Sequence, residues 1–441
     1  MGLLGTESNL LNSYLLYLEQ SSTMRWWGRV TRATGQLVES EGPFCAVGEC
    51  CEILDRTGHV YEGEVVGFRG PTVLSMTLQK VEGVRYGDRI TSWGARPSLG
   101  VGEELVGRVI DGSGQPVDQG PALRVERRWP LHSSPPLPLE RVPIREPAGC
   151  GVRAIDGLIT AGRGQRLGIF GGSGVGKSTL IGMMARGSSA DITVLALVGE
   201  RGREVREFLE KTLGAEGMRR SVVVVSTSDQ PPLLRIRAAL AASSVAEYFC
   251  SRGKNVLLVV DSLTRVAMAQ REIGLAAGEP PTSRGYTPSV FTLLARLIER
   301  AGRFGHGSIT GFYTVLMEGD DQQDPLVDAV RALLDGHIVL DRRLNMQNHF
   351  PPISILDSLS RLMVSVCSPE HLDKARHLRK LLAAYAASED LIRVGAYQKG
   401  LDPVLDRALT ALPALNAFLQ QEADRPVSFD ETVAALLALP D

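Results

Sequence analysis

The amino-acid sequence predicts an α/β protein whose parallel sheet is preceded by a small β-barrel and followed by an α-helical domain. Three observations lead to this prediction: short β-rich runs near the N-terminus, a regular alternation of apolar strands and helices in the middle, and an Ala/Leu-rich helical stretch at the end. A chain of 441 residues has room for two or three domains. We expect domains or segments at 1–24, 25–96, 97–366 and 367–441.

The composition is that of a globular protein. Forty-four per cent of the residues are hydrophobic, and 48 basic residues nearly balance 50 acidic ones, so nothing marks the whole chain as a nucleic-acid binder. The longest apolar runs, such as Val256–Val260, are too short to span a membrane. The N-terminus lacks the cationic start and cleavage site of a signal peptide, and the six cysteines are scattered. We therefore expect a cytoplasmic protein with reduced thiols.

The segment before the first domain has helical periodicity. Leu11, Tyr14, Leu15 and Leu18 are spaced to lie on one face of a short amphipathic helix. Such a helix either docks a partner or packs back on its own protein, and the pattern alone does not separate the two.

The β-rich region runs from about Arg25 to Trp93. Its apolar runs are short and are broken by Gly, Pro and Asp, which is typical of a small β-barrel. An oligonucleotide-binding barrel is one alternative. Trp26 and Trp27 are adjacent, so in a strand they point to opposite faces, and we expect one of them in the barrel core rather than stacked on bases.

A proline-rich connection at 130–147 marks a change of domain. Beyond it, strand-like runs alternate with helical stretches of ten or more residues, which is the rhythm of a parallel α/β sheet. These runs are Arg166–Phe170, Asp191–Val198, Ser221–Ser226 and Asn255–Asp261.

A phosphate-binding loop follows the first of these strands. Gly171–Ser178 matches G-x-x-x-x-G-K-[ST] and lies between the strand Leu167–Phe170 and the helix Thr179–Arg186. In such a loop the backbone N–H groups and the helix dipole face phosphates, the lysine reaches the β- and γ-phosphates, and the serine hydroxyl binds Mg²⁺. The candidate residues are Gly172, Ser173, Gly174, Val175, Gly176, Lys177, Ser178 and Thr179.

Two carboxylates are expected at the same edge of the sheet. The apolar strand Val256–Val260 leads directly into Asp261, so we interpret Asp261 as the carboxylate that holds the metal. Another strand runs into Glu200, which is placed to polarise an attacking water. The alternative for Glu200 is a solvated charge in a charged run, and the phosphate-binding loop makes the catalytic interpretation the stronger one.

Several longer motifs carry a resemblance to a known family. The sequence resembles the ring-forming catalytic ATPases related to the β subunit of rotary ATP synthase, and within them the type III secretion and flagellar protein-export ATPases. The resemblance covers nearly the whole chain and implies a RecA-like P-loop core. The matching stretches are 171–179, 199–205, 261–265, 278–290 and 335–340.

The resemblance implies roles for individual residues. Lys177, Ser178 and Thr179 would bind phosphates and Mg²⁺, and Glu200 would position the hydrolytic water. Arg201 and Arg265 would lie beside them. The resemblance also implies that an arginine in a Ser-x-Ser-Arg segment, here Arg361, enters the site of the neighbouring subunit.

Two aromatic residues and one departure from the family pattern complete the expected site. By resemblance Phe350 would stack on adenine, and Tyr385 is a candidate second wall, although core packing is the commoner role of such side chains. The family usually has Pro-Ala-Ile-Asp before the arginine finger, whereas this chain has Ser354 in place of the aspartate. This replacement leaves the orientation of Arg361 open.

We therefore expect a Mg²⁺-dependent ATP hydrolase in a homohexamer that energises export of flagellar proteins. The resemblance implies partners: export-regulator, central-stalk and export-gate proteins, chaperone-bound substrates, and recruitment to the inner membrane through these partners. An injectisome ATPase is the first alternative, and a ring motor resembling the Rho terminator, driven by RNA, is the second. A catalytically silent ring subunit is disfavoured because Glu200 is present.

Overall fold

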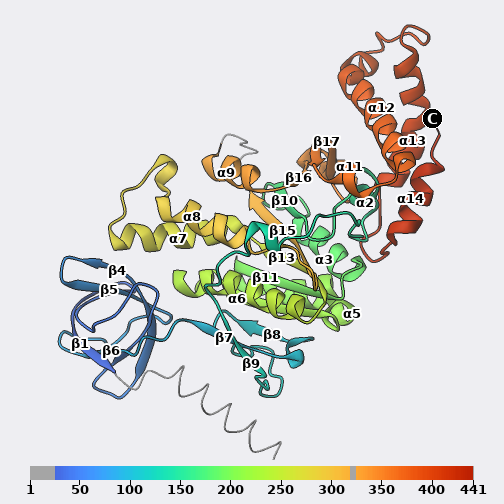
Figure 1. Ribbon diagram of the computed structural model, residues 1–441. Helices are drawn as coiled ribbons and strands as arrows, with labels where there is room; N and C mark the ends of the chain where they lie inside the picture. Colours follow the sequence, from blue (N-terminus) through green and yellow to red (C-terminus); the bar gives the residue numbers. More distant parts are fainter. Residues whose placement is uncertain (1–24, 318–323, 441) are drawn as a thin grey trace, which may run out of the picture.

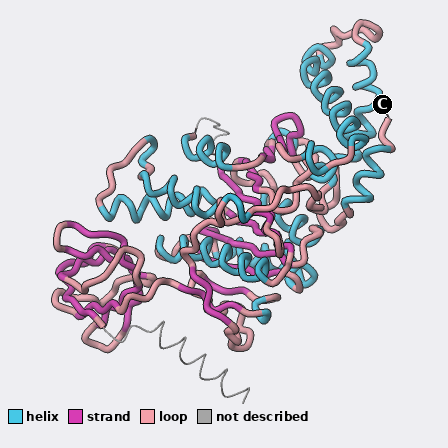
Figure 2. Tube along the Cα trace, in the orientation of Figure 1, coloured by secondary structure: helices cyan, strands magenta, loops and turns pink. Residues whose placement is uncertain are grey.

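The computed structural model describes residues 25–317 and 324–440. The expected amphipathic helix around Leu11–Leu18 lies outside these residues. Three parts follow one another along the chain: a β-barrel, a central α/β domain and a bundle of helices (Figures 1 and 2). In Figure 1 the barrel and the terminal helices lie at opposite ends, with the large sheet between them. The predicted fold class is confirmed.

The N-terminal barrel is closed by six strands in the order β1-β2-β5-β4-β3-β6. Its core is small and consists of alternate inward-facing side chains such as Val30, Val38, Ile53 and Ile90. The strands are β1 (Trp26–Thr34), β2 (Leu37–Glu41), β3 (Cys50–Leu54), β4 (Val60–Arg69), β5 (Thr72–Thr77) and β6 (Arg89–Ser92).

The expectation that Trp26 or Trp27 fills the barrel core is wrong. Both side chains are about half exposed, although Trp26 and Trp27 lie in β1 and pair with Ser92 and Thr91 of β6. The first apolar side chain of β1 in the small barrel core is that of Val30. The Trp26 ring contacts Phe44, with 5.7 Å between ring centroids. Arginine side chains cover the Trp27 ring, so each indole is covered by its neighbours at the surface rather than by the core.

The central sheet has the strand order β17-β16-β10-β15-β13-β11-β12-β8, and β14 pairs with β15. All pairings along β16-β10-β15-β13-β11-β12-β8 are parallel, whereas β17 is antiparallel to β16. The strands are β8 (Val109–Asp111), β10 (Arg166–Gly171), β11 (Ile192–Glu200), β12 (Ser221–Thr227), β13 (Asn255–Asp261), β14 (Gly302–Arg303), β15 (Ser308–Leu316), β16 (Gly336–Leu340) and β17 (Ile353–Ser360).

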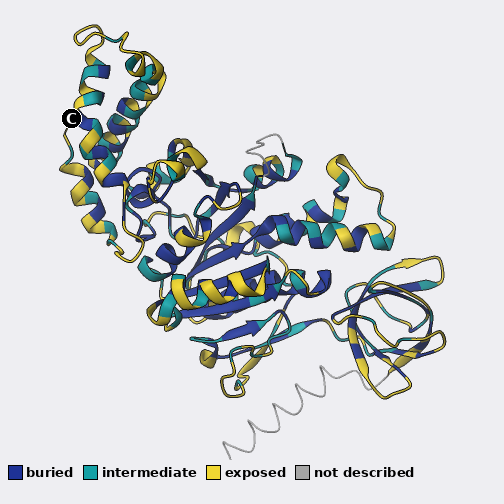
Figure 3. Cartoon of the chain, turned by 180° about the vertical axis from the view of Figure 1, so that it is seen from behind, coloured by how far each residue is buried: buried dark blue, intermediate teal, exposed yellow. Residues whose placement is uncertain are grey.

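Helices cover both faces of this sheet, so its central strands β10, β11 and β13 are mostly buried and apolar (Figure 3). One face packs on α6 (Pro232–Ser251), α7 (Leu263–Ala277), α8 (Pro288–Ile298) and α9 (Pro325–Leu333). The other face packs on α2 (Arg153–Leu158), α3 (Lys177–Gly187) and the helices of the C-terminal part. Consecutive strand residues alternate between the two cores, as the pleat requires.

The remaining elements connect these layers. A two-stranded ribbon follows the barrel, and a buried ion pair between Glu64 on β4 and Arg237 on α6 joins the barrel to the central domain. The shorter elements are β7 (Ser98–Val101), β9 (Arg127–Pro130), α4 (Gly202–Glu207), a π-helical turn (Phe208–Leu213), α5 (Gly214–Met218), α10 (Arg342–Met346), α11 (Met363–Val366) and the 3-10 turns Glu103–Leu105, Pro138–Glu140 and Ser283–Gly285.

The C-terminal part consists of α12 (Pro369–Arg393), α13 (Pro403–Leu419) and α14 (Phe429–Leu437). Leu378, Leu405 and Phe418 pack inward with the apolar residues of α2 and α3, so these helices are anchored to the sheet layer rather than tethered loosely. No helix among residues 25–317 and 324–440 is long and apolar enough to cross a membrane.

Candidate active site

The loop Gly171–Ser178 lies where β10 ends and α3 begins. Gly174 and Gly176 have φ of +75° and +107°, a region that side chains disfavour, so glycine lets the backbone turn sharply into the helix. The first N–H groups of α3 have no partner within the helix and point out of its N-terminus. This arrangement makes an anion-binding site out of main-chain atoms.

A buried ion pair links the loop to the end of β13. The ammonium of Lys177 lies 2.8 Å from Oδ1 of Asp261, and both residues are buried. The hydroxyl of Thr314 on β15 donates to the same carboxylate oxygen at 2.6 Å. The cation that is expected to meet phosphates is thus held by the carboxylate that is expected to hold a metal.

Glu200 lies at the same edge, because parallel pairing sets Leu197 of β11 opposite Asp261 of β13. Burial, the negative charge of Asp261 and a hydrogen bond with Glu204 together raise the pKa of Glu200 to about 7, against the opposing effect of Lys177. A carboxyl group with a pKa near neutrality is suited to accept a proton from water.

The two expected arginines differ in their surroundings. The stem of Arg265 packs against Gly199, where an added Cβ would lie 3.0 Å from it, and Gly199 has a φ of +71°. Nε of Arg265 is buried and makes no hydrogen bond to any described residue. Arg201 is exposed and lies 3.7 Å from Glu204. Of these two arginines, Arg265 is therefore the one with a buried, unused donor, and it lies beside Gly199 near the end of β11.

The expected adenine wall Phe350 lies in the segment after α10 and is 38 % exposed. Its carbonyl accepts a hydrogen bond from the backbone N–H of Gln421, just beyond α13. Tyr385 is half-buried against the core that α12 shares with its neighbours. No ring contact between Phe350 and Tyr385 is present among the described residues.

The structure does not bring Arg361 to this site. Arg361 follows β17, and its N–H donates to the carbonyl of Asp335, beside Arg166 at the start of β10. The loop follows the other end of β10, a strand of six residues, so about 17 Å separates the two edges. Ser354, the residue that departs from the family pattern, donates to Asp357 at 2.6 Å.

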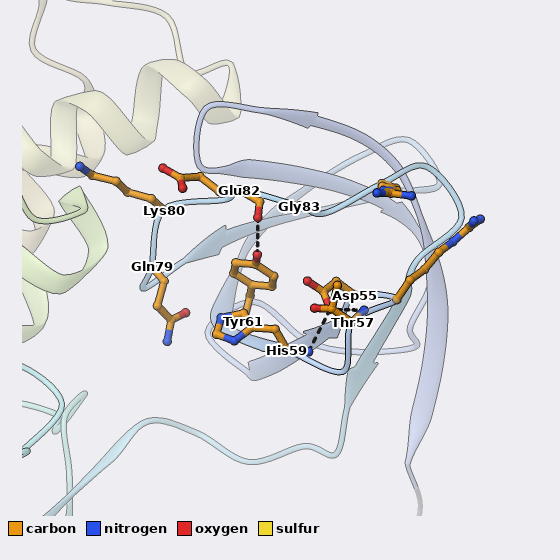
Figure 4. Close-up of a pocket in the computed structure, with 10 residues that line it drawn as sticks. Asp55, Thr57, His59, Tyr61, Gln79, Lys80, Glu82 and Gly83 are labelled. Atoms are coloured by element: carbon orange, nitrogen blue, oxygen red, sulfur yellow. Dashed lines mark hydrogen bonds between the residues drawn. The ribbon is translucent and has the colours of Figure 1, made fainter.

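A separate hollow of about 490 Å³ lies on the barrel, between the turn after β3 and the connection from β5 to β6 (Figure 4). In it Asp55 holds the turn through Thr57 and His59, and Tyr61 donates to the carbonyl of Glu82. It contains none of the expected catalytic residues, so the nucleotide site rests on the loop after β10 and not on this hollow.

The donor set at the sheet edge fits a magnesium nucleotide. The Ser178 hydroxyl and the Asp261 carboxylate are oxygen ligands, which Mg²⁺ prefers. The loop amides, Lys177 and the unused Nε of Arg265 are donors suited to phosphate oxygens. Fold and site together define a P-loop nucleoside triphosphatase.

Comparison with known proteins identifies the branch of that class. Residues 151–360 match the ATP synthase alpha/beta family, nucleotide-binding domain, and residues 367–438 match the T3SS EscN ATPase C-terminal domain. The "Flagellum-specific ATP synthase" of Bacillus subtilis is 50% identical over 96% of this chain and 97% of its own. The "Type 3 secretion system ATPase" of Xanthomonas euvesicatoria is 46% identical over 95% of each chain.

A solved structure agrees with these relatives. The assembled ATPase EscN, in complex with its central stalk EscO from the type III secretion system of enteropathogenic E. coli, has a TM-score of 0.86 and 44% identity, covering 93% of this chain and 98% of that one. The chain belongs to the ATP synthase alpha/beta family, in its branch of flagellum-specific and type III secretion ATPases. It is an ATP-binding ATPase of protein secretion, as the sequence predicts.

Sequence reasoning missed three residues at this site. Thr314 binds Asp261, and Arg342 and Asn345 on α10 contact the carbonyls of Ser173 and Gly174 in the phosphate loop. Thr314 lies inside the apolar strand β15, and a hydroxyl among apolar residues was the only feature of the sequence that could have indicated its role. The α10 residues had none, since a helix of five residues leaves no periodicity to find.

Proposed function

We propose that this chain hydrolyses Mg-ATP in a homohexameric ring and uses the energy to deliver flagellar export substrates. The observation that carries the proposal is the position of Arg361 at the opposite sheet edge from its own phosphate loop. A side chain there does not reach the site of its own subunit, whereas in a ring that edge can face a neighbour. Support for a ring with a central stalk comes from the E. coli relative, which assembles and binds EscO.

The roles of the residues follow from their chemistry. Ser178, and Asp261 through water, would hold Mg²⁺, which when bound would supply positive charge to the phosphates. Lys177, held ready by Asp261, binds the β- and γ-phosphates, and the loop amides orient them. Glu200 accepts the proton of the attacking water, and Arg265 stabilises the charge that develops on the phosphoryl group. Phe350 packs on the base.

Two serines support the finger in this scheme. The Ser358 hydroxyl accepts from the N–H of Val339 on β16, and the Ser360 hydroxyl donates to the carbonyl of Thr160. Both side chains are buried, which leaves Arg361 to point outward at the surface. Ser354 donates to Asp357 in the same segment at 2.6 Å.

A mixing experiment tests the shared site. Arg361→Ala and Lys177→Ala proteins are each expected to be inactive, because one lacks the finger and the other lacks the phosphate cation. Mixed rings contain some interfaces that pair an intact loop with an intact arginine, so phosphate release should partly return. Light scattering must show that mixed oligomers form. If they form and no activity returns, the arginine does not act between subunits.

The export system is a second question, because both flagellar and injectisome ATPases are close relatives. We favour the flagellar system because the loop Gly172–Gly176 resembles that of the flagellar members of the family, whereas injectisome members commonly carry an Ala-Gly-Gly-Gly-Lys type of loop. The test is to express the chain in Bacillus subtilis lacking its own flagellum-specific ATPase and to measure swimming. Restored secretion in a Xanthomonas euvesicatoria strain lacking its secretion ATPase, without restored swimming in the first host, would favour the injectisome.

A further inference from the structure

Helix α10 lies against the phosphate loop, on the side to which the carbonyls of Ser173 and Gly174 point. It follows β16 directly, and two of its side chains donate to loop carbonyls. Nδ2 of Asn345 lies 3.1 Å from the carbonyl oxygen of Gly174, and Nη2 of Arg342 lies 3.5 Å from that of Ser173. Neither side chain belongs to the loop motif, and neither is among the residues that the catalytic scheme uses.

These contacts fix the direction of the amides that bind phosphate. In a planar trans peptide, a carbonyl and the N–H of the next residue point in opposite directions. A donor on α10 that holds the Gly174 carbonyl toward α10 therefore aims the N–H of Val175 away from α10. The contact with Ser173 does the same for the N–H of Gly174.

The tip of the loop needs such a restraint. At Gly174 an added Cβ would meet no atom within 4 Å, so no neighbouring group packs against the loop on the side where a side chain would project. Gly174 also has a φ of +75°, and a glycine reaches many other conformations at little energetic cost. Hydrogen bonds from α10 thus supply an orientation that packing does not.

Helix α10 is itself held at both ends, so its donors are presented in a fixed position. At its start, Asp341 accepts from the N–H of Arg343 at 2.7 Å and donates its own N–H to Pro352. At its end, the N–H of His349 donates to Leu344. The carbonyl of the next residue, Phe350, accepts the hydrogen bond from the N–H of Gln421 in the C-terminal part.

We propose that Asn345, assisted by Arg342, is a positioning residue that holds the phosphate loop in its nucleotide-binding conformation and so sets the affinity for nucleotide phosphates. It acts through the loop backbone and does not touch the reacting atoms. The proposal rests on nucleotide binding by this loop, and it needs neither the hexamer nor the export system.

Two variants at one position test this role. Asn345→Ala removes the donor, and loss of one hydrogen bond should weaken binding of a fluorescent ADP analogue by about 3- to 10-fold. Asn345→Asp keeps the size but sets a carboxylate against the Gly174 carbonyl and close to the phosphates, so its binding should be weaker still. Gln347→Ala, an exposed position of the same segment, is the matched control and should bind like wild type.

Kinetics separate positioning from a general loss of structure. The KM for Mg-ATP should rise in both Asn345 variants while kcat at saturation stays within about two-fold of wild type, because Lys177 and Glu200 remain in place. Wild-type binding in the same assay reports on the nucleotide site itself. Wild-type affinity in both variants would overturn the proposal. So would a fall in kcat at unchanged KM, or Asn345→Asp binding as tightly as wild type.

Discussion

The two edges of the central sheet differ in how their charged side chains are buried and paired. At the edge where β10, β11 and β13 end, Lys177, Asp261 and Glu200 are gathered and partly or fully buried. At the opposite edge Arg166 is neutralised by Asp335 and Glu299 at 3.1 and 2.5 Å, and beside them Arg361 is exposed. The first edge resembles a site prepared for a charged ligand. The second resembles a structural network with one arginine presented to the outside.

This difference indicates how the catalytic groups are distributed within one chain. The groups for binding and for water activation lie at one edge and belong to one subunit. The arginine that we propose as the finger lies at the other edge, where it serves a neighbour. Variants at the two edges should therefore fail in different ways, and the predictions below run from the largest expected effect to the smallest.

Lys177→Ala is expected to have the largest effect. It removes the cation for the phosphates and leaves Asp261 without its cationic partner in a buried site, so ATP turnover should fall by at least about 10³-fold. Phosphate release at saturating Mg-ATP measures this. Lys254→Ala, at an exposed position, is the control and should keep wild-type activity. Turnover of Lys177→Ala near the wild-type rate would contradict the site at the first edge.

Glu200→Gln should separate binding from hydrolysis. The amide keeps the size of the side chain but loses the basic oxygen, so turnover should fall by about 10²-fold while a fluorescent ATP analogue binds normally. Glu207→Gln, which changes an exposed carboxylate on the neighbouring helix, should leave both unchanged. Normal binding together with normal turnover in Glu200→Gln would show that the catalytic carboxylate lies elsewhere.

The second edge predicts a dependence on assembly. If Arg361 completes a neighbour's site, specific activity should rise several-fold as protein concentration increases and rings close. Arg361→Ala should stay inactive even when light scattering shows that it is assembled. Specific activity that is independent of concentration across the range in which oligomers form would argue that each chain works alone.

The smallest effect is a pH dependence at the first edge. The pKa of Glu200 is raised to about 7, first by burial and then by Asp261, and only the ionised form can accept a proton. The rate should therefore fall as pH decreases through about 7, by less than about 10-fold over one pH unit. A rate profile measured from about pH 6 to about pH 8 tests this, and the residual activity of Glu200→Gln should lack the step.

Much of the fold was predictable because it rests on local patterns. The apolar run before Asp261 predicts β13, and the strand, glycines and helix around Lys177 predict the phosphate loop. Other segments were misread for physical reasons. Trp26 and Trp27 suggested a core residue by alternation, yet the strand carries both of them outside the small barrel core. The motif that contains Arg361 can be recognised in the sequence. The edge of the sheet at which Arg361 lies cannot be predicted from it.

The sequence by itself determined the chemistry that is available: the loop amides, a lysine, two carboxylates at strand ends, and the arginine motif. These signals are short in sequence, and the backbone geometry of a strand or a glycine turn fixes them locally. Only the tertiary structure decided which of them meet. Parallel pairing in the order β10-β15-β13-β11 brings Asp261 between Lys177 and Thr314. Pairing of β16 with β10 brings α10 and Asn345 to the loop, and the antiparallel β17 ends at the far edge with Arg361, because strand register joins residues that no local pattern links.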